Sequence, residues 1–211
     1  MPILTMLSIL KKFPLRKEHS IIVILIILLS MMAFIFNNSL SDFLVYQQDL
    51  IVQGQVWRLL TGHFFHTNHY HLLLNLAAVV MLWALHGHFY YVKNTSLLFI
   101  TSGLTCSLGL YFFSPSIIQY VGLSGVLHGF FIWGALMDIK NKEKTGYWLV
   151  LGVCLKIAHE QFYGASTDIS ALINARVAID AHLWGAVGGL LFFIMAAILS
   201  VFSVNKKAAK A

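Results

Sequence analysis

The sequence predicts an all-α membrane protein with six transmembrane helices. Hydrophobic residues make up 59% of the 211 residues and charged residues only 10%, whereas about a quarter of a soluble domain is charged. The mean hydropathy of +0.79 agrees. The length allows one domain. The net charge of +6 would also fit a nucleic-acid-binding protein, but the basic residues stand in short clusters between apolar runs, which is typical of membrane proteins. We therefore expect the lipid bilayer as a partner, and no nucleic acid.

The first apolar run, "SIIVILIILLSMMAFIF" at 20–36, follows a basic segment and could be taken for a signal peptide. No small-x-small cleavage site comes after it; "NNSLSDF" follows instead. The run is also long enough to span a bilayer. We predict an uncleaved first transmembrane helix.

Five more apolar runs complete the six predicted spans, at 70–87, 95–113, 121–138, 146–160 and 178–204. About 20 helical residues cross roughly 30 Å of hydrocarbon, so the fourth and fifth runs are short. The predicted organisation is a cytoplasmic N-terminal segment at 1–19, a six-helix membrane domain at 20–204 and a basic cytoplasmic tail at 205–211.

The distribution of Lys and Arg predicts the orientation. Loops that must share one side of a six-span protein hold Lys11, Lys12, Arg16, Lys17, Lys93, Lys140, Lys142, Lys144, Lys206, Lys207 and Lys210. The opposite loops hold little more than Arg58 and Arg176. By the positive-inside rule both termini are cytoplasmic. We expect an integral, multi-pass protein of a bacterial inner membrane.

Polar residues from three distant spans are predicted to lie at one depth. Ser124 is near the start of span four, His182 near the start of span six, and His71 and Asn75 near the start of span two. All three spans run from outside to inside, and a helix rises 1.5 Å per residue. These side chains therefore lie in about the outer third of the membrane, facing the periplasm.

These residue types fit nucleophilic catalysis. A Ser hydroxyl becomes a good nucleophile when a base such as His takes its proton, and donors must stabilise the oxyanion that forms. His71 and Asn75 are four apart and share one helix face. A lone Ser in a membrane helix usually bonds back to a carbonyl, whereas an intramembrane His is costly and usually functional. The shared depth favours catalysis, with Ser124 as nucleophile and His182 as base.

Two pairs of glycines predict that spans four and six pack closely. Gly125 and Gly129 form a GxxxG pattern on span four, and Gly185 and Gly189 form another on span six. Such patterns often indicate only helix packing. Here the packing would bring Ser124 near His182, and the glycines around Ser124, including Gly122, would let a substrate approach.

A zinc site is the natural alternative for the segment "GHFFHTNHYHLLLN" at 62–75, which contains His63, His66, His69 and His71. There is no HExxH motif, no Glu in the segment and no Cys nearby. We expect neither a metal nor a cofactor, and we interpret most of these histidines as loop or interface residues. Cys106 and Cys154 both lie in apolar runs and are predicted to be buried small apolar residues.

The chain resembles the rhomboid family of intramembrane serine proteases over about residues 50–200. The matching segments are "GQVWRLLTGHFFH" with Trp57 and Arg58, "HLLLN" at 71–75, "GLSG" at 122–125 and "AHLWGAVGG" at 181–189. The resemblance implies a six-helix rhomboid-like bundle and a Ser124–His182 dyad without a third member. It also implies an oxyanion hole made by His71, Asn75 and the Ser124 amide.

One position departs from the family pattern. Many rhomboids have an aromatic residue four positions after the Ser, stacked under the dyad His, and this chain has His128 there. His128 is therefore a second candidate base. We expect it to support His182 instead, because it lies deeper in the membrane than Ser124.

Finer features resemble the rhombosortase branch of the family: "GLSGVLHG", "GALMDI" and "LKIAHEQFYG". That resemblance implies transmembrane protein substrates bearing a C-terminal GlyGly-CTERM segment, which consists of a Gly-rich motif, a transmembrane helix and a basic tail.

Three charged residues near the predicted site allow more than one interpretation. Lys156 and Glu160 are four apart on one helix face, and are either a mutually neutralised pair or a contact for a substrate tail or outer loop. Asp180 is two residues from His182, so helix geometry points it elsewhere. We interpret Asp180 as an interface residue or a cap.

Two other functions compete with proteolysis. A small transporter would have polar residues along a pathway, but here they stop in the outer third. An inactive rhomboid-like binding protein typically loses the Ser or the His, and this chain has both.

Overall fold

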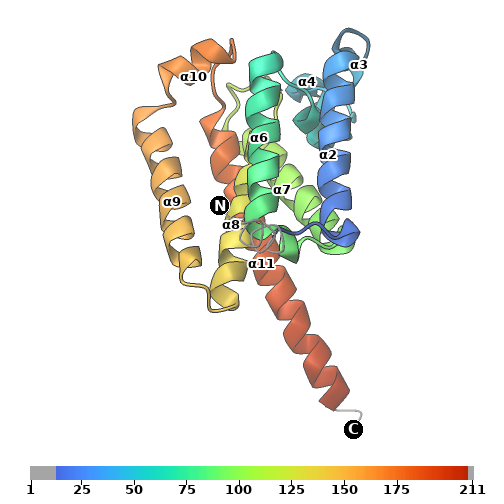
Figure 1. Cartoon of the computed structure of the whole chain (residues 1–211). Coiled ribbons are helices and arrows are strands. Elements are labelled where there is room, and N and C mark those ends of the chain that lie inside the picture. Colours follow the sequence, from blue (N-terminus) through green and yellow to red (C-terminus); the bar gives the residue numbers. More distant parts are fainter. Residues whose placement is uncertain (1–12, 209–211) are drawn as a thin grey trace.

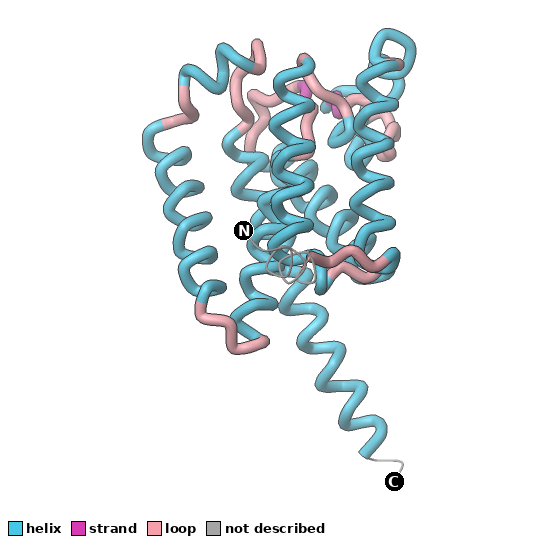
Figure 2. Tube along the Cα trace, viewed as in Figure 1, coloured by secondary structure: helices cyan, strands magenta, loops and turns pink. Residues whose placement is uncertain are grey.

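The computed structural model describes residues 13–208, and this part of the chain contains six long helices (Figures 1 and 2). They are α2 (Lys17–Ile35), α6 (His69–His86), α7 (Val92–Phe113), α8 (Ser124–Lys140), α9 (Thr145–Tyr163) and α11 (Ile179–Ala208). These helices lie at the six predicted positions, so the all-α architecture is confirmed. Residues 1–12 and 209–211 lie outside the described part, so most of the predicted segment 1–19 and the end of the tail 205–211 are not covered.

Four of these helices are long and apolar enough to cross a membrane. They are α2, α6 with the short η2 (Gly87–Phe89) that follows it, α7, and α11 from Ile179 to Leu199. The protein is thus an integral, multi-pass membrane protein. Helix α8 has only 17 residues, and α9 contains Lys156, His159 and Glu160. Whether α8 and α9 also cross the membrane stays a prediction.

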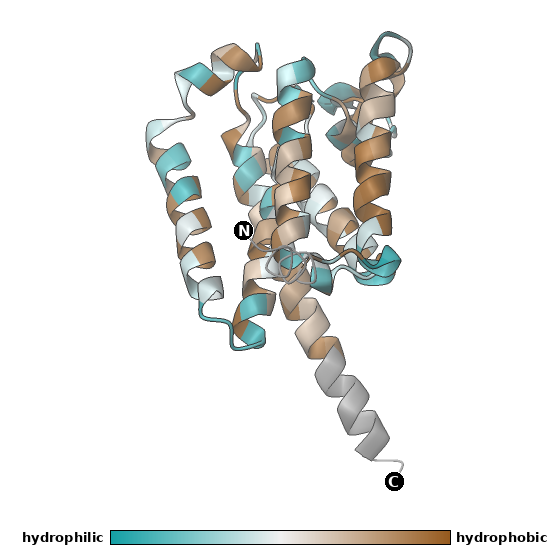
Figure 3. Ribbon diagram, in the orientation of Figure 1, coloured by the Kyte–Doolittle hydropathy of each residue, from teal (hydrophilic) through white to brown (hydrophobic). Residues whose placement is uncertain are grey.

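The long helices alternate in direction, so the start of α2 and the end of α11 lie at the same end of the bundle (Figure 1). An even number of crossings would place both on one side of a membrane, as predicted. Apolar residues cover the outward faces, most clearly on α2 (Figure 3); Ile24 and Leu28 are both more than half exposed there. Such surfaces fit contact with lipid.

Short elements that the sequence did not predict fill the opposite end of the bundle. Between α2 and α6 lie α3 (Asn37–Leu44), β1 (Tyr46–Gln47), α4 (Gln48–Val52), α5 (Arg58–Thr61) and η1 (Gly62–Phe64), while β2 (Gln119–Tyr120) precedes α8 and α10 (Thr167–Leu172) precedes α11. Strands β1 and β2 pair antiparallel with Tyr46 opposite Tyr120. The first loop is thereby joined to the segment that leads into Ser124.

The Trp57–Arg58 pair holds this first loop in place. Arg58 is 2% exposed and donates to the carbonyl oxygens of Val45 at 2.6 Å and Asp42 at 2.5 Å. The Trp57 indole donates to the Phe43 carbonyl at 2.9 Å. A guanidinium can satisfy several carbonyls at once, so these bonds fix an otherwise irregular backbone.

Helices α8 and α11 pack through their glycines. A Cβ added at Gly185 would overlap the carbonyl of Gly125, and one added at Gly189 would overlap that of Gly129. Small residues at such positions let two membrane helices approach until their backbones touch. The close α8–α11 packing is the contact that the two GxxxG patterns predict.

Helix α9 is much less enclosed. It packs on α8 and to a smaller extent on α11, and Figure 1 shows it at the edge of the bundle, apart from α6. Cys154 lies on α9 and is exposed, whereas Cys106 on α7 is buried. The prediction that Cys154 is buried was wrong, because α9 covers its neighbours with only one face.

Candidate active site

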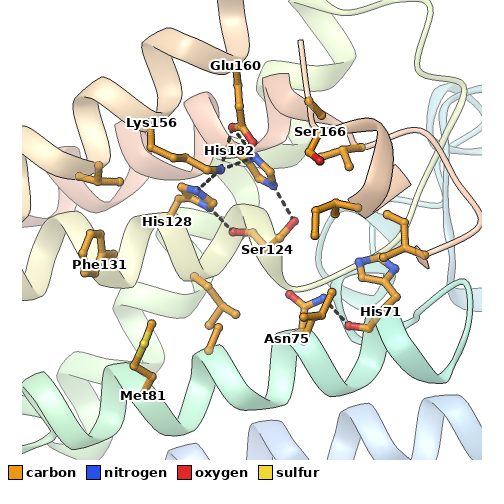
Figure 4. Close-up of a pocket in the computed structure, with 18 of the residues that line it drawn as sticks. His71, Asn75, Met81, Ser124, His128, Phe131, Lys156, Glu160, Ser166 and His182 are labelled. Carbon is orange, nitrogen blue, oxygen red and sulfur yellow. Dashed lines mark hydrogen bonds and ion pairs between the residues drawn. The ribbon is translucent and has the colours of Figure 1, made fainter. Parts of the chain in front are cut away.

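Ser124 and His182 meet where α8 and α11 begin (Figure 4). Ser124 is the first residue of α8, and its Oγ lies 3.0 Å from Nε2 of His182. His182 is buried in the first turn of α11. The close α8–α11 packing therefore places an imidazole nitrogen within hydrogen-bond reach of the hydroxyl, which a general base requires.

Gly122 shapes the turn that leads into Ser124. Its φ of +118° is in the region that favours glycine, and a Cβ there would lie 2.7 Å from Nε2 of His71. The hydroxyl of Tyr120 donates to the Gly122 carbonyl at 2.9 Å. The turn can thus approach the His71 ring only because residue 122 has no side chain.

His71 and Asn75 lie on α6 on the opposite side of Ser124 (Figure 4). Asn68 caps α6 by accepting from the His71 amide at 2.9 Å. Nδ1 of His71 lies 3.2 Å from the Thr67 hydroxyl, which leaves Nε2 directed at Gly122. The Asn75 amide donates to the His71 carbonyl at 2.9 Å and retains a second N–H. Both side chains can thus offer a donor near Ser124.

The start of α6 is tied to the last loop before α11. The Thr67 hydroxyl donates to the Ile173 carbonyl at 2.6 Å and the Asn68 amide to the Leu172 carbonyl at 2.9 Å. These two bonds connect α6 with the end of α10 across the top of the site. The loop before α11 is therefore coupled to the start of α6, on which His71 and Asn75 lie.

His128 stacks on His182. The two rings are 4.2 Å apart at 18°, and Nδ1 of His128 donates to the Ser124 carbonyl at 2.7 Å. His128 is thus bonded to the backbone of Ser124, while the hydroxyl is bonded to His182. The ring thus lies where the family pattern places an aromatic residue, and the supporting role of His128 stays a prediction.

Glu160 and Lys156 of α9 also reach the site (Figure 4). Oε2 of Glu160 lies 2.8 Å from Nδ1 of His182 and 2.7 Å from Nζ of Lys156. The Lys156–Glu160 pairing follows from their spacing, but their contact with His182 was not predicted. The dyad without a third member stays a prediction, and the structure places a carboxylate at the second nitrogen of the histidine.

His128, Glu160 and His182 present three metal-ligand atoms within 4.8 Å of one another, and are the only such group among residues 13–208. Nζ of Lys156 lies 2.7–3.0 Å from an atom of each. The ammonium group thus already supplies a cation to this cluster, which favours Lys156 over a metal ion there.

The histidine-rich segment at 62–75 divides between loop and site. Nε2 of His63 lies 3.0 Å from the Gly103 carbonyl oxygen and 3.1 Å from the Ser107 hydroxyl, and burial lowers its pKa. His66 is buried with its ring 5.0 Å from that of His71, and burial, with His71 second, lowers its pKa to about 3. Both histidines are buried in the first loop, and within the described residues neither ring nitrogen of His66 has a hydrogen-bond partner.

Asp180 faces away from the reacting atoms, as expected. It accepts from the Ser114 hydroxyl at 2.6 Å and from the Gln161 amide at 3.3 Å. Asp180 therefore links the start of α11 to the end of α7 and to α9, and it contributes a polar contact beside the site.

Two cavities meet at Ser124. One, of about 490 Å³, is lined mainly by apolar residues of α6, α8, α9 and α10, including Met81, Phe131 and Gly152. The other, of about 690 Å³, lies under the loops at that end of the bundle and is lined by polar residues such as Gln119 and Arg176 together with apolar ones. Ser124 and His71 line both cavities. The hydroxyl therefore faces an apolar groove on one side and a polar space on the other.

Comparison with known proteins decides the family. A family model described as the rhomboid domain matches residues 53–199. The chain belongs to the rhomboid family. It is 26% identical over 162 residues to the rhomboid protease GluP of Bacillus subtilis, covering 77% of this chain and 30% of that protein. It is 30% identical over 144 residues to the rhomboid-like protease 5 of Toxoplasma gondii, covering 66% of this chain and 16% of that protein.

A third relative is nearer in length. The putative rhomboid protease YdcA of Bacillus subtilis is 26% identical over 157 residues, which are 74% of this chain and 72% of that protein. The chain thus spans less than a third of two of its relatives and most of the third. The predicted family is confirmed, while the rhombosortase branch stays a prediction.

Proposed function

We propose that this rhomboid protein is an intramembrane serine endopeptidase in which Ser124 is the nucleophile and His182 the general base. The observation that supports this most strongly is the 3.0 Å contact between Oγ of Ser124 and Nε2 of His182. The two residues are 58 positions apart in the sequence and lie on different helices. The close glycine packing of α8 against α11 fixes the distance between them.

The first half of the reaction forms an ester. Oγ attacks the scissile carbonyl as its proton passes to Nε2 of His182. The oxyanion forms near Nε2 of His71, the Asn75 amide and the backbone N–H of Ser124. His182 then gives the proton to the leaving amine as the C–N bond breaks, which leaves an acyl-enzyme at Ser124.

The second half consumes a water molecule. The polar cavity beside Ser124 offers water a path that the apolar groove does not. His182 takes a proton from that water, its oxygen attacks the ester, and Oγ leaves with the proton returned by His182. The N-terminal part of the substrate is released as a carboxylate.

The substrate we propose is a transmembrane protein segment that reaches Ser124 through the groove between α6 and α9. The groove is mainly apolar and is lined along one side by α9, so it suits a peptide that arrives from lipid. Ser124 can attack only a substrate peptide bond that is not enclosed in a helix. The substrate must therefore unwind easily at the cleavage point, and glycine favours this. A Gly-rich GlyGly-CTERM segment meets that need, and the rhombosortase-like sequence segments support the same choice.

Cleavage of a helical membrane substrate in liposomes by the parent, Ser124→Ala and His182→Ala proteins tests the activity. We expect both variants to be inactive although folded, and a substrate whose Gly-Gly pair is replaced by Leu-Leu to be cleaved more slowly. Parent-like turnover by Ser124→Ala would contradict the proposal. A parent protein that cleaves no helical substrate, and whose Ser124 does not react with a fluorophosphonate, would favour a transporter or an inactive binding protein.

His128→Phe tests which histidine is the base. The Phe ring restores the family's stacked aromatic, so we expect measurable activity, whereas His182→Ala has none. If His128→Phe is inactive and His182→Ala retains turnover, His128 is the base.

The proposed active site faces the periplasm, with both termini in the cytoplasm of a bacterial cell and the helices in its inner membrane. The distribution of Lys and Arg supports this orientation. Alkaline phosphatase fused after residue 115 should be active, and after residue 141 inactive. The reverse result would overturn the orientation.

A further inference from the structure

His182 has two polar partners, one on each ring nitrogen. Nε2 faces Ser124 at 3.0 Å and Nδ1 faces Oε2 of Glu160 at 2.8 Å. The side chains of His182 and Glu160 are only 7% and 13% exposed. For Nε2 to accept the Ser124 proton, Nδ1 must carry the hydrogen of the neutral ring. A carboxylate at Nδ1 selects that tautomer and stabilises the imidazolium that forms.

We propose that Glu160 is a positioning residue for His182, so that the site is a Ser124–His182–Glu160 triad. This inference rests on the proposed protease function. Glu160 lies on α9, which is less enclosed than the helices carrying Ser124 and His182. The acid thus comes from a third helix, 22 positions before the histidine.

The surrounding hydrogen bonds fit a single assignment of protons. The Ser124 carbonyl can only accept, so Nδ1 of His128 carries a hydrogen and its Nε2 has a lone pair. That lone pair accepts from Lys156 at 2.8 Å. Lys156 donates a second hydrogen to Glu160 at 2.7 Å, and Glu160 accepts from Nδ1 of His182. With this assignment, every donated hydrogen in the network between Ser124 and His128 has an acceptor.

Lys156 could also stabilise the other tautomer of His182. Its Nζ is also 3.0 Å from Nδ1 of His182. If Lys156 donated there, the ring would carry its hydrogen on Nε2 and could not accept from Ser124. The charged Glu160 oxygen accepts from both Lys156 and His182, and so keeps Nδ1 as a donor. Without the carboxylate, Lys156 is free to favour the unproductive tautomer.

The alternative is that Glu160 only neutralises Lys156. The two roles predict different relative effects for loss of Glu160 and loss of Lys156. If the residues are simply a salt bridge, removing either one leaves an unpaired charge, and removing both relieves it. If Glu160 orients His182, loss of Glu160 is far more harmful than loss of Lys156, and removing both does not restore the parent rate.

The rate of fluorophosphonate labelling of Ser124 in the purified, full-length protein separates these cases. We expect Glu160→Gln to lower the rate by about 10⁴-fold, as loss of a triad acid does elsewhere, and Glu160→Asp to retain more because it keeps the charge. Lys156→Met should lose less than about tenfold. The double variant should label somewhat faster than Glu160→Gln, because Lys156 no longer competes for Nδ1 of His182, but should stay far below the parent rate. The matched control is Asp180→Asn, a carboxylate-to-amide change two residues from His182, which should label at close to the parent rate.

The pH dependence gives a readout that a purely structural role would not move. The titratable groups facing His182 are His71 from α6, His128 from α8, and Lys156 and Glu160 from α9. Loss of the Glu160 carboxylate destabilises the imidazolium, so the acid limb of the pH–labelling curve should move to lower pH, while Asp180→Asn leaves it in place. The folded state of each variant is checked by its melting temperature.

Near-parent labelling of Glu160→Gln would overturn the inference. So would equal losses for Glu160→Gln and Lys156→Met with recovery in the double variant. If Glu160→Gln fails to fold, the double variant, which has no unpaired charge, decides the question by the same labelling rate. A parent protein that is not labelled at Ser124 would instead contradict the proposed function itself.

Discussion

The two sides of the bundle differ in how tightly their helices meet, and Ser124 lies between them. On one side, α8 and α11 touch backbone to backbone, and a Cβ at Gly185 would overlap the Gly125 carbonyl. On the other side, α9 stands apart from α6 and a cavity of about 490 Å³ lies between them. At Gly152 of α9 a Cβ would meet nothing within 4 Å.

This difference separates two needs of the proposed chemistry. The Ser124–His182 contact must hold within a few tenths of an ångström, and tight packing in a membrane provides that precision. A substrate must enter from lipid, and the loosely packed side provides the room. Glu160 lies on the loosely packed side but bonds the histidine on the tight side, so it connects the two.

The largest effect is expected where the tight side is broken. Gly185→Leu places a side chain into the Gly125 backbone, which cannot move away as a flexible side chain could. Overpacking typically costs about 1–3 kcal/mol, and a clash with backbone costs at least as much. We expect a large fall in melting temperature in detergent and no labelling of Ser124.

Gly152→Leu is the matched control for that variant, because it makes the same change on α9. Its melting temperature should stay close to that of the parent. If the two variants lose the same stability, the contrast between the two sides of the bundle is not real.

The next largest effect is a loss of kcat on replacing residues of α6. This helix borders the loosely packed side and carries the proposed oxyanion donors. We expect His71→Ala and Asn75→Ala each to lower kcat by about 10²–10³-fold with little change in KM, because their donors act on charge that appears only in the transition state. Steady-state cleavage in liposomes measures both constants. A loss that appears only in KM would reassign the residue to substrate contact.

A smaller effect is expected from narrowing the groove. Gly152→Leu adds a side chain to the groove that Gly152, Phe131 and Ser124 all line. Cleavage of a helical membrane substrate should fall by about tenfold, while labelling by a small fluorophosphonate should not change. Equal effects on both reactions would show that the substrate does not use this groove.

The smallest effect is a loss of folding stability at acid pH, which arises from His66 in the first loop. His66 has a folded-state pKa of about 3 against an ordinary value of 6.5. Well above pH 6.5 it is neutral in both states, so its protonation does not affect the free energy of unfolding. As the pH falls below 6.5 only the unfolded chain binds the proton, so stability declines by about 2 kcal/mol at about pH 5.

His66→Phe removes that group, so its melting temperature should fall less between neutral and acid pH than that of the parent. The control is His69→Phe, which alters an exposed histidine and should keep the parent's pH dependence. If His66→Phe and the parent lose stability in parallel, burial of His66 does not contribute to the acid sensitivity.

The positions of the six long helices and the meeting of Ser124 with His182 could be predicted because both depend on patterns local in sequence. Apolar runs predict each helix, and two GxxxG patterns predict which helices pack closely. The stacking of His128 under His182 follows from its position one turn after Ser124 and from the family resemblance.

Other features depend on contacts that no local pattern contains. Lys156 and Glu160 are a visible i,i+4 pair, but only the placement of α9 beside α8 brings Glu160 to Nδ1 of His182. The short pairing of Tyr46 with Tyr120 joins segments more than seventy residues apart. Cys154 was predicted to be buried from its apolar neighbours, which instead cover the outward face of α9.

The measurement that tests the central claim most directly is covalent labelling of the purified protein by a fluorophosphonate, with the modified residue located by mass spectrometry. The reaction requires a serine activated by a nearby base. Modification at Ser124 in the parent, and its absence in both Ser124→Ala and His182→Ala, is the expected result. A parent protein that does not react, or a His182→Ala variant that reacts as fast as the parent, would contradict the account.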